Sequence, residues 1–133
     1  DTIPYDNPQS NFMLQMSDAE FHNMNVQQIQ FMCKNPEKQK VIEAMMKKAN
    51  RKTYVYGYID MLNLDLRTAI ANITIPVTVI AATSPDKATV EKTYTEQFAK
   101  LPGVLIKYAD NAAHFVMYDN PEWFVKNIME SLK

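Results

Sequence analysis

The sequence predicts an α/β protein in which a helical first part, residues 1–70, precedes a strand–helix–strand–helix part, residues 71–133. The first part carries capping residues followed by apolar side chains at helical spacing. The second part contains two short runs rich in β-branched residues, separated by one helix-length of mixed sequence. Two strands joined through a helix are parallel, so we expect the second part to belong to a parallel sheet.

The composition is that of one globular domain and excludes several classes of function. The chain has 133 residues, of which 47% are hydrophobic and 22% charged, and its net charge is −1. A net charge this close to zero does not indicate the basic surface that binds nucleic acid. No apolar run approaches the roughly 20 residues of a membrane span. We therefore expect a soluble protein with no nucleic-acid or membrane partner. The sequence does not fix its compartment, with the cytoplasm slightly favoured.

Glycine and cysteine are both scarce. The two glycines, Gly57 and Gly103, are too few for a phosphate-binding loop, a dinucleotide fingerprint or a G-x-S-x-G elbow within this chain. Cys33 has no partner for a disulfide and no Cys or His at metal-ligand spacing. We expect it to be a small buried side chain, and we expect neither a metal nor an organic cofactor.

Three helical stretches are expected in the first part, after an extended lead-in over residues 1–12. The first begins after Ser17, which has Glu20 at capping-box spacing. The second follows Asn35 and Pro36, which suit the cap and the first helical position. The third, over residues 53–73, is expected to be interrupted near Gly57 or beyond Asp65, with a short helix closing it at residues 67–70.

The second part begins with "ITIPVTVIAAT", residues 73–83, which predicts a strand buried on both faces. A helix follows within residues 86–103, where Pro102 and Gly103 stop it, and a second strand is expected over residues 104–110. A last helix over 119–133 is expected to be capped by Asp119 or Asn120, with Pro121 at its first position. Two such strands are not a stable sheet alone, so further strands or a partner edge are expected, and the isolated chain is expected to self-associate.

One histidine stands just after the second predicted strand, in "YADNAAHFVMYDNPEWF". His114 is either a packed loop residue or part of a reactive site. The segments "LDLRTAIANITIPVTVIAATSPD" and "VLIKYADNAAHFVMYDNPEWFVKNIMESL" resemble the end of the lid and the last two strands of α/β-hydrolases. The resemblance covers residues 60–133 well, whereas residues 1–60 match only loosely, as the lid. The resemblance rests on a short series of residues in the second segment: His114 and Phe115, then Asp119, then Pro121 and Glu122.

The resemblance implies a partial α/β-hydrolase fold with Asp86 as the triad acid and His114 as the base. A carboxylate on one imidazole nitrogen fixes the tautomer while the other nitrogen takes the proton of a nucleophile. Both residues follow predicted strands, at the edge where parallel sheets place their sites. The acid loop is one residue longer than is common, so Asp110 remains the alternative acid.

The nucleophile that this chemistry requires is missing. None of Ser10, Ser17, Ser84 and Ser131 lies on a glycine-flanked strand-to-helix turn. The chain is therefore expected to be the C-terminal part of a hydrolase that cleaves an ester, amide or thioester with an apolar moiety. Its partners would be the small-molecule substrate and either the missing N-terminal half or a second copy of the chain. The alternative is a non-catalytic, hydrolase-like interaction module.

Overall fold

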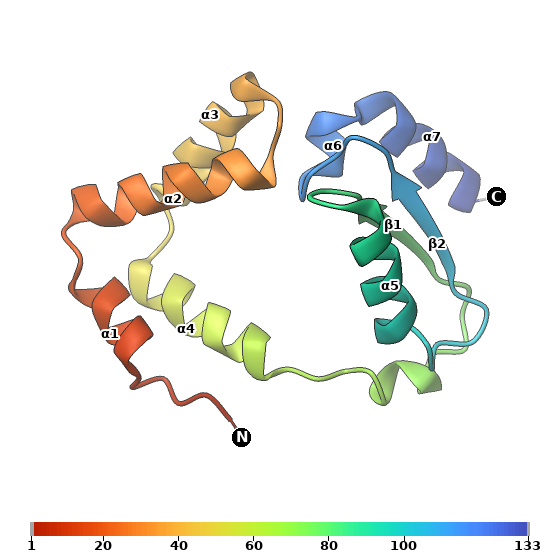
Figure 1. The fold of residues 1–133 in the computed structure, drawn as a ribbon, viewed down its shortest axis with the longest axis horizontal. Coiled ribbons are helices and arrows are strands. Elements are labelled where there is room, and N and C mark those ends of the chain that lie inside the picture. Colours follow the sequence, from red (N-terminus) through yellow and green to blue (C-terminus); the bar gives the residue numbers. More distant parts are fainter. Residues whose placement is uncertain (1, 133) are drawn as a thin grey trace.

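The computed structural model describes residues 2–132 and has the mixed helical and parallel-strand architecture that the sequence predicts. Figure 1 shows two sides: helices α1–α4 form one, and the strands with α5–α7 form the other. We call residues 2–70 the helical segment and residues 71–132 the strand segment. The helical segment contains α1 (Pro8–Gln15), α2 (Asp18–Met32), α3 (Pro36–Met46) and α4 (Arg51–Asn63).

Side-chain caps begin all four of these helices. Ser17 and Glu20 form the predicted capping box of α2, and the side chain of Asn35 accepts the N–H groups of Glu37 and Lys38 at the start of α3. The prediction of an extended segment over residues 1–12 is wrong beyond Asn7. The side chain of Asn7 caps α1, and Pro8 lies in the first turn, so the chain is already helical from Pro8 onward.

Of the two interruptions considered, the one near Gly57 is absent, because α4 runs unbroken from Arg51 to Asn63. The helix instead ends at Asn63, slightly before the alternative position beyond Asp65. A glycine in an exposed helix costs about 1 kcal/mol relative to alanine, which buried neighbours such as Val55 and Ile59 offset. The short closing helix forms as a 3-10 turn, η1 (Ala69–Asn72), slightly later than expected.

The strand segment contains a two-stranded parallel sheet, β1 (Thr78–Ala82) and β2 (Leu105–Ala109), with Ala82 opposite Ala109. The parallel pairing is confirmed. The strand expected over residues 73–83 is shorter, because β2 supplies partners for five residues only. Among residues 2–132 no third strand pairs with either outer edge, so both edges of this sheet are open.

Helices lie on both sides of the strands (Figure 1). On one face, Tyr94 of α5 (Lys87–Gln97) meets Tyr108 of β2 edge-to-face, with ring centroids 6.4 Å apart. On the other face, Trp123 and Phe124 of α7 (Pro121–Ser131) pack on a cluster of small residues that includes Ala109. The strands therefore separate one layer of helix from another.

The expected burial of β1 on both faces is wrong. Of the two strands, only Ala81 and Ala109 are buried; Ile80 is half-buried and Leu105 is 52% exposed. Ile75, just before β1, is 71% exposed. Large apolar side chains therefore remain in contact with water around the two described strands.

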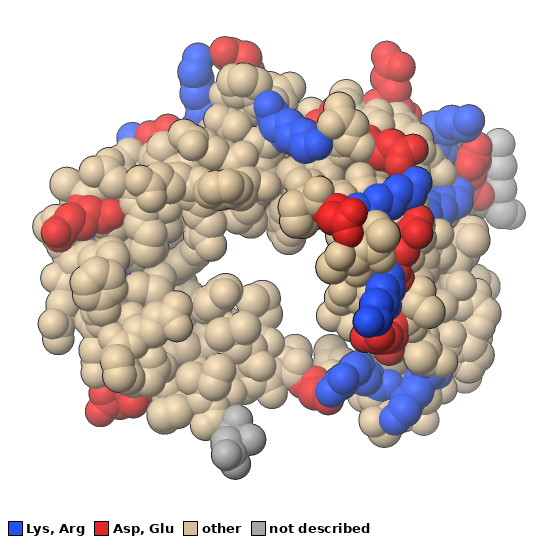
Figure 2. Space-filling view, in the orientation of Figure 1, with Lys and Arg blue, Asp and Glu red and all other residues tan. Residues whose placement is uncertain are grey.

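Figure 2 shows an opening through the molecule between its two sides, which meet where α2 and α3 approach α6 (Val116–Asp119). Ile29, Cys33 and Ile42 form a buried cluster there, against which Phe115 and Tyr118 pack. This junction, and the chain linking α4 to β1, join the helical segment to the strand segment. None of the helices described is both long and apolar enough to cross a bilayer.

Candidate functional site

The loops that follow β1 and β2 are bonded to each other, so the two strand ends form one structural unit. The backbone N–H groups of Thr83 and Ser84 both donate to the carbonyl oxygen of Ala112, at 3.2 and 3.1 Å. The buried hydroxyl of Thr83 donates to the carbonyl oxygen of Ala109 at 2.8 Å. The carboxyl end of the sheet thus brings the loops that carry Asp86 and His114 together, as the strand order predicts.

Asp86 caps α5. Its Oδ2 accepts the backbone N–H of Thr89 at 2.8 Å, and the residue is exposed. Hydrogen bonding by Thr89 holds the pKa of the Asp86 carboxyl below its ordinary value, so the group is ionised at neutral pH. Asp86 was assigned a catalytic role from the sequence and was not predicted to cap α5, although aspartate is among the commonest capping residues.

His114 lies in the loop between β2 and α6, with its ring edge-to-face against Phe115 at 5.2 Å between centroids. The residue is exposed, whereas the two alanines before it, Ala112 and Ala113, are buried. A loop anchored by two buried alanines thus presents an accessible imidazole, which a proton-transfer residue requires.

The two proposed triad members follow strands whose loops are bonded to each other, but their own side chains are not bonded. Among the hydrogen bonds of residues 2–132, none joins the Asp86 carboxylate to the His114 imidazole. Thr89 occupies Oδ2 of Asp86, and a carboxylate has a second oxygen that can accept. The alternative acid, Asp110, is 78% exposed at its side chain and pairs with Lys87 at 2.9 Å.

His114 borders a cavity of about 320 Å³ that both segments of the chain line. The helical segment contributes Phe31 and Met32 from the end of α2. The strand segment contributes mainly apolar side chains from β1, its following loop and α5: Ala82, Pro85, Val90 and Tyr94. A cavity lined in this way suits the apolar part of a small molecule held beside the imidazole.

Ser84 also lines this cavity, and it is the serine nearest in the chain to Asp86. It lies in an irregular loop before a cis peptide bond to Pro85, not on a strand-to-helix elbow. No hydrogen bond among the described residues joins its hydroxyl to His114. Ser10, by contrast, is buried and donates to the carbonyl oxygen of Tyr5. The described serines thus provide no elbow nucleophile.

Asp119 has a role that the sequence did not reveal. Asp119 or Asn120 was expected to cap the last helix. Asn120 does occupy the cap position of α7, but neither side chain makes a cap hydrogen bond there. Pro121 does occupy the first turn, as predicted. The Asp119 carboxylate instead bonds backward, to Ala113 in the histidine loop and to residues 33–35 between α2 and α3.

Cys33 is fully buried, as expected for a small packed side chain. Burial raises the pKa of its thiol, and the nearby Asp119 carboxylate raises that pKa further. The described residues contain no group of three or more His, Cys, Asp or Glu side chains arranged to hold a metal ion. The second histidine, His22, pairs with Glu43 at 3.1 Å in the helical segment.

Comparisons of the chain with protein-family models, with curated proteins and with solved structures each found no match.

Proposed function

We propose that this chain is the C-terminal part of a serine-type α/β-hydrolase acting on an ester, amide or thioester with a small apolar moiety. Residues 1–70 form its lid and residues 71–133 the last part of its core. The observation that carries the proposal is His114 itself: an exposed histidine at the carboxyl end of a parallel strand, beside an apolar cavity.

In this proposal His114 takes the proton of a serine hydroxyl supplied by the missing N-terminal half, and then gives it to the leaving group. Asp86 orients the imidazole in the complete protein, where its carboxylate would accept from His114 in addition to the backbone N–H of Thr89. The open sheet edges and the exposed apolar side chains beside them support a missing half, because further strands would cover both.

The test is turnover of a short-chain nitrophenyl ester by the protein that carries the nucleophile. His114→Ala is expected to lower kcat by at least about 1,000-fold, because a triad acts as a unit. His22→Ala is the matched control, since His22 pairs with Glu43 away from the cavity, and it should retain activity. Wild-type turnover in the His114 variant would overturn the catalytic assignment.

The alternative is a non-catalytic interaction module with a hydrolase-like half. The bond between Asp86 and Thr89 favours it, because the carboxylate already has a structural role in α5. The two proposals differ in what the coding sequence before Asp1 contains. A strand, a G-x-S-x-G turn and a helix support the enzyme. An upstream sequence without them supports the module.

A further inference from the structure

The Asp119 carboxylate receives four donors from two separate parts of the chain. Its Oδ1 accepts the backbone N–H groups of Lys34 at 2.8 Å and Asn35 at 3.2 Å, and the Cys33 thiol at 3.4 Å. Its Oδ2 accepts the backbone N–H of Ala113 at 2.8 Å. One side chain thus holds the connection between α2 and α3 against the loop that carries His114.

Both neighbours of His114 are tied through this junction. Ala113 donates to Asp119, and Phe115 donates its N–H to the carbonyl oxygen of Met32, at 3.1 Å, at the end of α2. A third link joins the Lys34 ammonium to the Asn111 side chain at 2.8 Å. The backbone of Phe115 is thus bonded directly to the helical segment, and that of Ala113 is linked to it through the Asp119 carboxylate.

The hydrogen bonds of Asp119 are not those of a helix cap. α6 is a single turn of four residues that ends at Asp119. The carboxylate also caps nothing in α7. Ionised acceptors make stronger hydrogen bonds than neutral ones, so its contribution comes from the contacts with Ala113 and residues 33–35.

We propose that Asp119 is a positioning residue, whose carboxylate seats the helical segment and the backbone next to His114 in a single arrangement. Docking of the lid and orientation of the imidazole are then one event. The catalytic consequence rests on the proposed function. The docking itself does not, because it is a property of contacts within this chain.

Cys33 reports on the docking, since it is the chain's only cysteine, is fully buried and touches Asp119. In the full chain, Asp119→Asn keeps the size of the side chain but replaces one acceptor oxygen with a donor that opposes an N–H group. We expect the Cys33 labelling rate, normalised to the urea-unfolded chain, to rise at least about tenfold through local opening.

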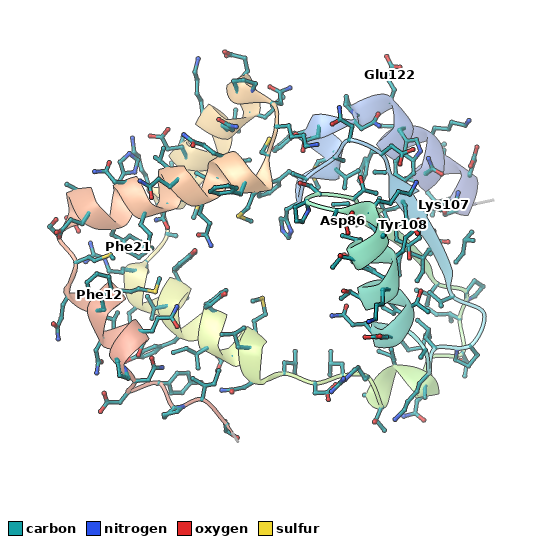
Figure 3. The ribbon with its side chains drawn as sticks, viewed as in Figure 1. Phe12, Phe21, Asp86, Lys107, Tyr108 and Glu122 are labelled. Atoms are coloured by element: carbon teal, nitrogen blue, oxygen red, sulfur yellow. The ribbon has the colours of Figure 1, made fainter. Side chains whose placement is uncertain are left out.

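The matched control is Glu122→Gln. Glu122 is exposed and three residues away, and Figure 3 shows its side chain directed outward from the helix. This carboxylate-to-amide change should leave Cys33 labelling at the wild-type rate. Equal labelling in the Asp119 variant and the wild type would overturn the proposal.

The imidazole resonances separate positioning from general loosening. Asp119→Asn is expected to shift the His114 ring signals and leave those of His22 unchanged, because His22 pairs with Glu43 away from the junction. An unmoved His114 signal, or an equal shift of both histidines, would contradict a positioning role.

Hydrogen exchange in the wild-type chain keeps the proposal testable if the variant does not fold. Docking as one event predicts that the amides of Lys34, Asn35, Ala113 and Phe115 open together, with the same protection and the same response to urea. Independent opening of Ala113 and Lys34 would refute the coupling.

The catalytic consequence has its own readout in the protein that carries the nucleophile. Asp119→Asn should lower kcat by about tenfold or more, because the imidazole is misplaced. It should raise KM by a smaller factor, because only two of the eight residues that line the cavity, Phe31 and Met32, belong to the loosened helical segment. An unchanged kcat, where His114→Ala abolishes turnover, would sink the positioning role. Full activity in His114→Ala would instead sink the proposed function and leave the docking result standing.

Discussion

The chain contains the tripeptide Asn-Pro-Glu twice, and the two copies start helices in different ways. In residues 35–37 the asparagine side chain caps α3 by accepting two backbone N–H groups. In residues 120–122 the asparagine makes no cap bond, although α7 begins at the same point in the tripeptide. The same local sequence therefore acts through its side chain in the helical segment and without it in the strand segment.

The backbone explains the difference. Asn35 has φ −83° and ψ 111°, a conformation that brings its side chain over the first turn. Asn120 has φ −142° and ψ 67°, and its own N–H is bonded at 2.8 Å to the carbonyl oxygen of Val116 in α6, so it continues from the preceding helical turn. A cap works where the chain enters a helix from an extended segment, and it is overridden where packing has fixed the preceding turn.

The largest expected effect tests whether packing holds α6 and the start of α7. Ile29 is 2% exposed in the cluster that includes Phe115 and Tyr118, so Ile29→Ala should lower the free energy of unfolding by about 2–5 kcal/mol. Ile75 is 71% exposed, and Ile75→Ala should stay within about 0.5 kcal/mol. Urea unfolding of both variants measures the difference, and equal losses would contradict this account of the core.

The open sheet edges predict the next effect, which is association of the isolated chain. Light scattering should give an average mass that rises above the monomer value with concentration, because unpaired strand edges bind other strands. Leu105→Lys places a charge on exposed β2 and should reduce the association. A monomer over a wide concentration range would count against an unfinished sheet.

The two asparagines provide a smaller and more local effect. Asn35→Ala should cost about 1 kcal/mol of stability, the usual loss for a side-chain cap. Asn120→Ala should cost less than about 0.5 kcal/mol, since its side chain reaches only the Asp110 carbonyl oxygen, at 3.5 Å. Similar losses in the two variants, measured by urea unfolding, would remove the contrast between the tripeptides.

The smallest effect concerns the cap at Asp86 and its response to pH. Its pKa in the folded chain is lowered, so its contribution to stability is present above the unfolded pKa and is lost as pH falls through the folded one. Asp86→Asn keeps a capping oxygen but does not titrate. The variant should therefore lose less stability than wild type as the pH falls from about 5 to about 2, in urea titrations across that range. If the stability of the variant and of the wild type fell equally over this pH range, the assigned contribution of the Asp86 cap would be contradicted.

The helical segment was largely predictable because its information is local. Ser17 with Glu20, and Asn35 with Pro36, identify two helix starts that the structure confirms. The start of α1 carries the same kind of pattern in Asn7 and Pro8 and was missed. Proline at the first helical position after a capping residue was sufficient information there.

The order and parallel pairing of the strands were predictable from the sequence, whereas the length of β1 and the long-range contacts of Asp119 were not. The length of β1 depends on how many residues β2 offers, which no pattern within residues 73–83 encodes. The contacts of Asp119 with Lys34 and Asn35 span 85 and 84 residues of chain, so local spacing could not reveal them. The loops that carry Asp86 and His114 are bonded to each other, but no hydrogen bond among residues 2–132 joins the two side chains, so their pairing stays a prediction.

Turnover of a short-chain ester by Asp86→Asn, His114→Ala and the double variant tests the central proposal most directly. The amide side chain that replaces the Asp86 carboxylate would still cap α5 but carry no charge, so the fold is kept while the support of the imidazolium is lost. We predict that each single change lowers kcat by about 1,000-fold or more, and that the double variant is no slower than the slower single one. Wild-type turnover in Asp86→Asn, or losses that multiply in the double variant, would show that the two residues do not act as one unit.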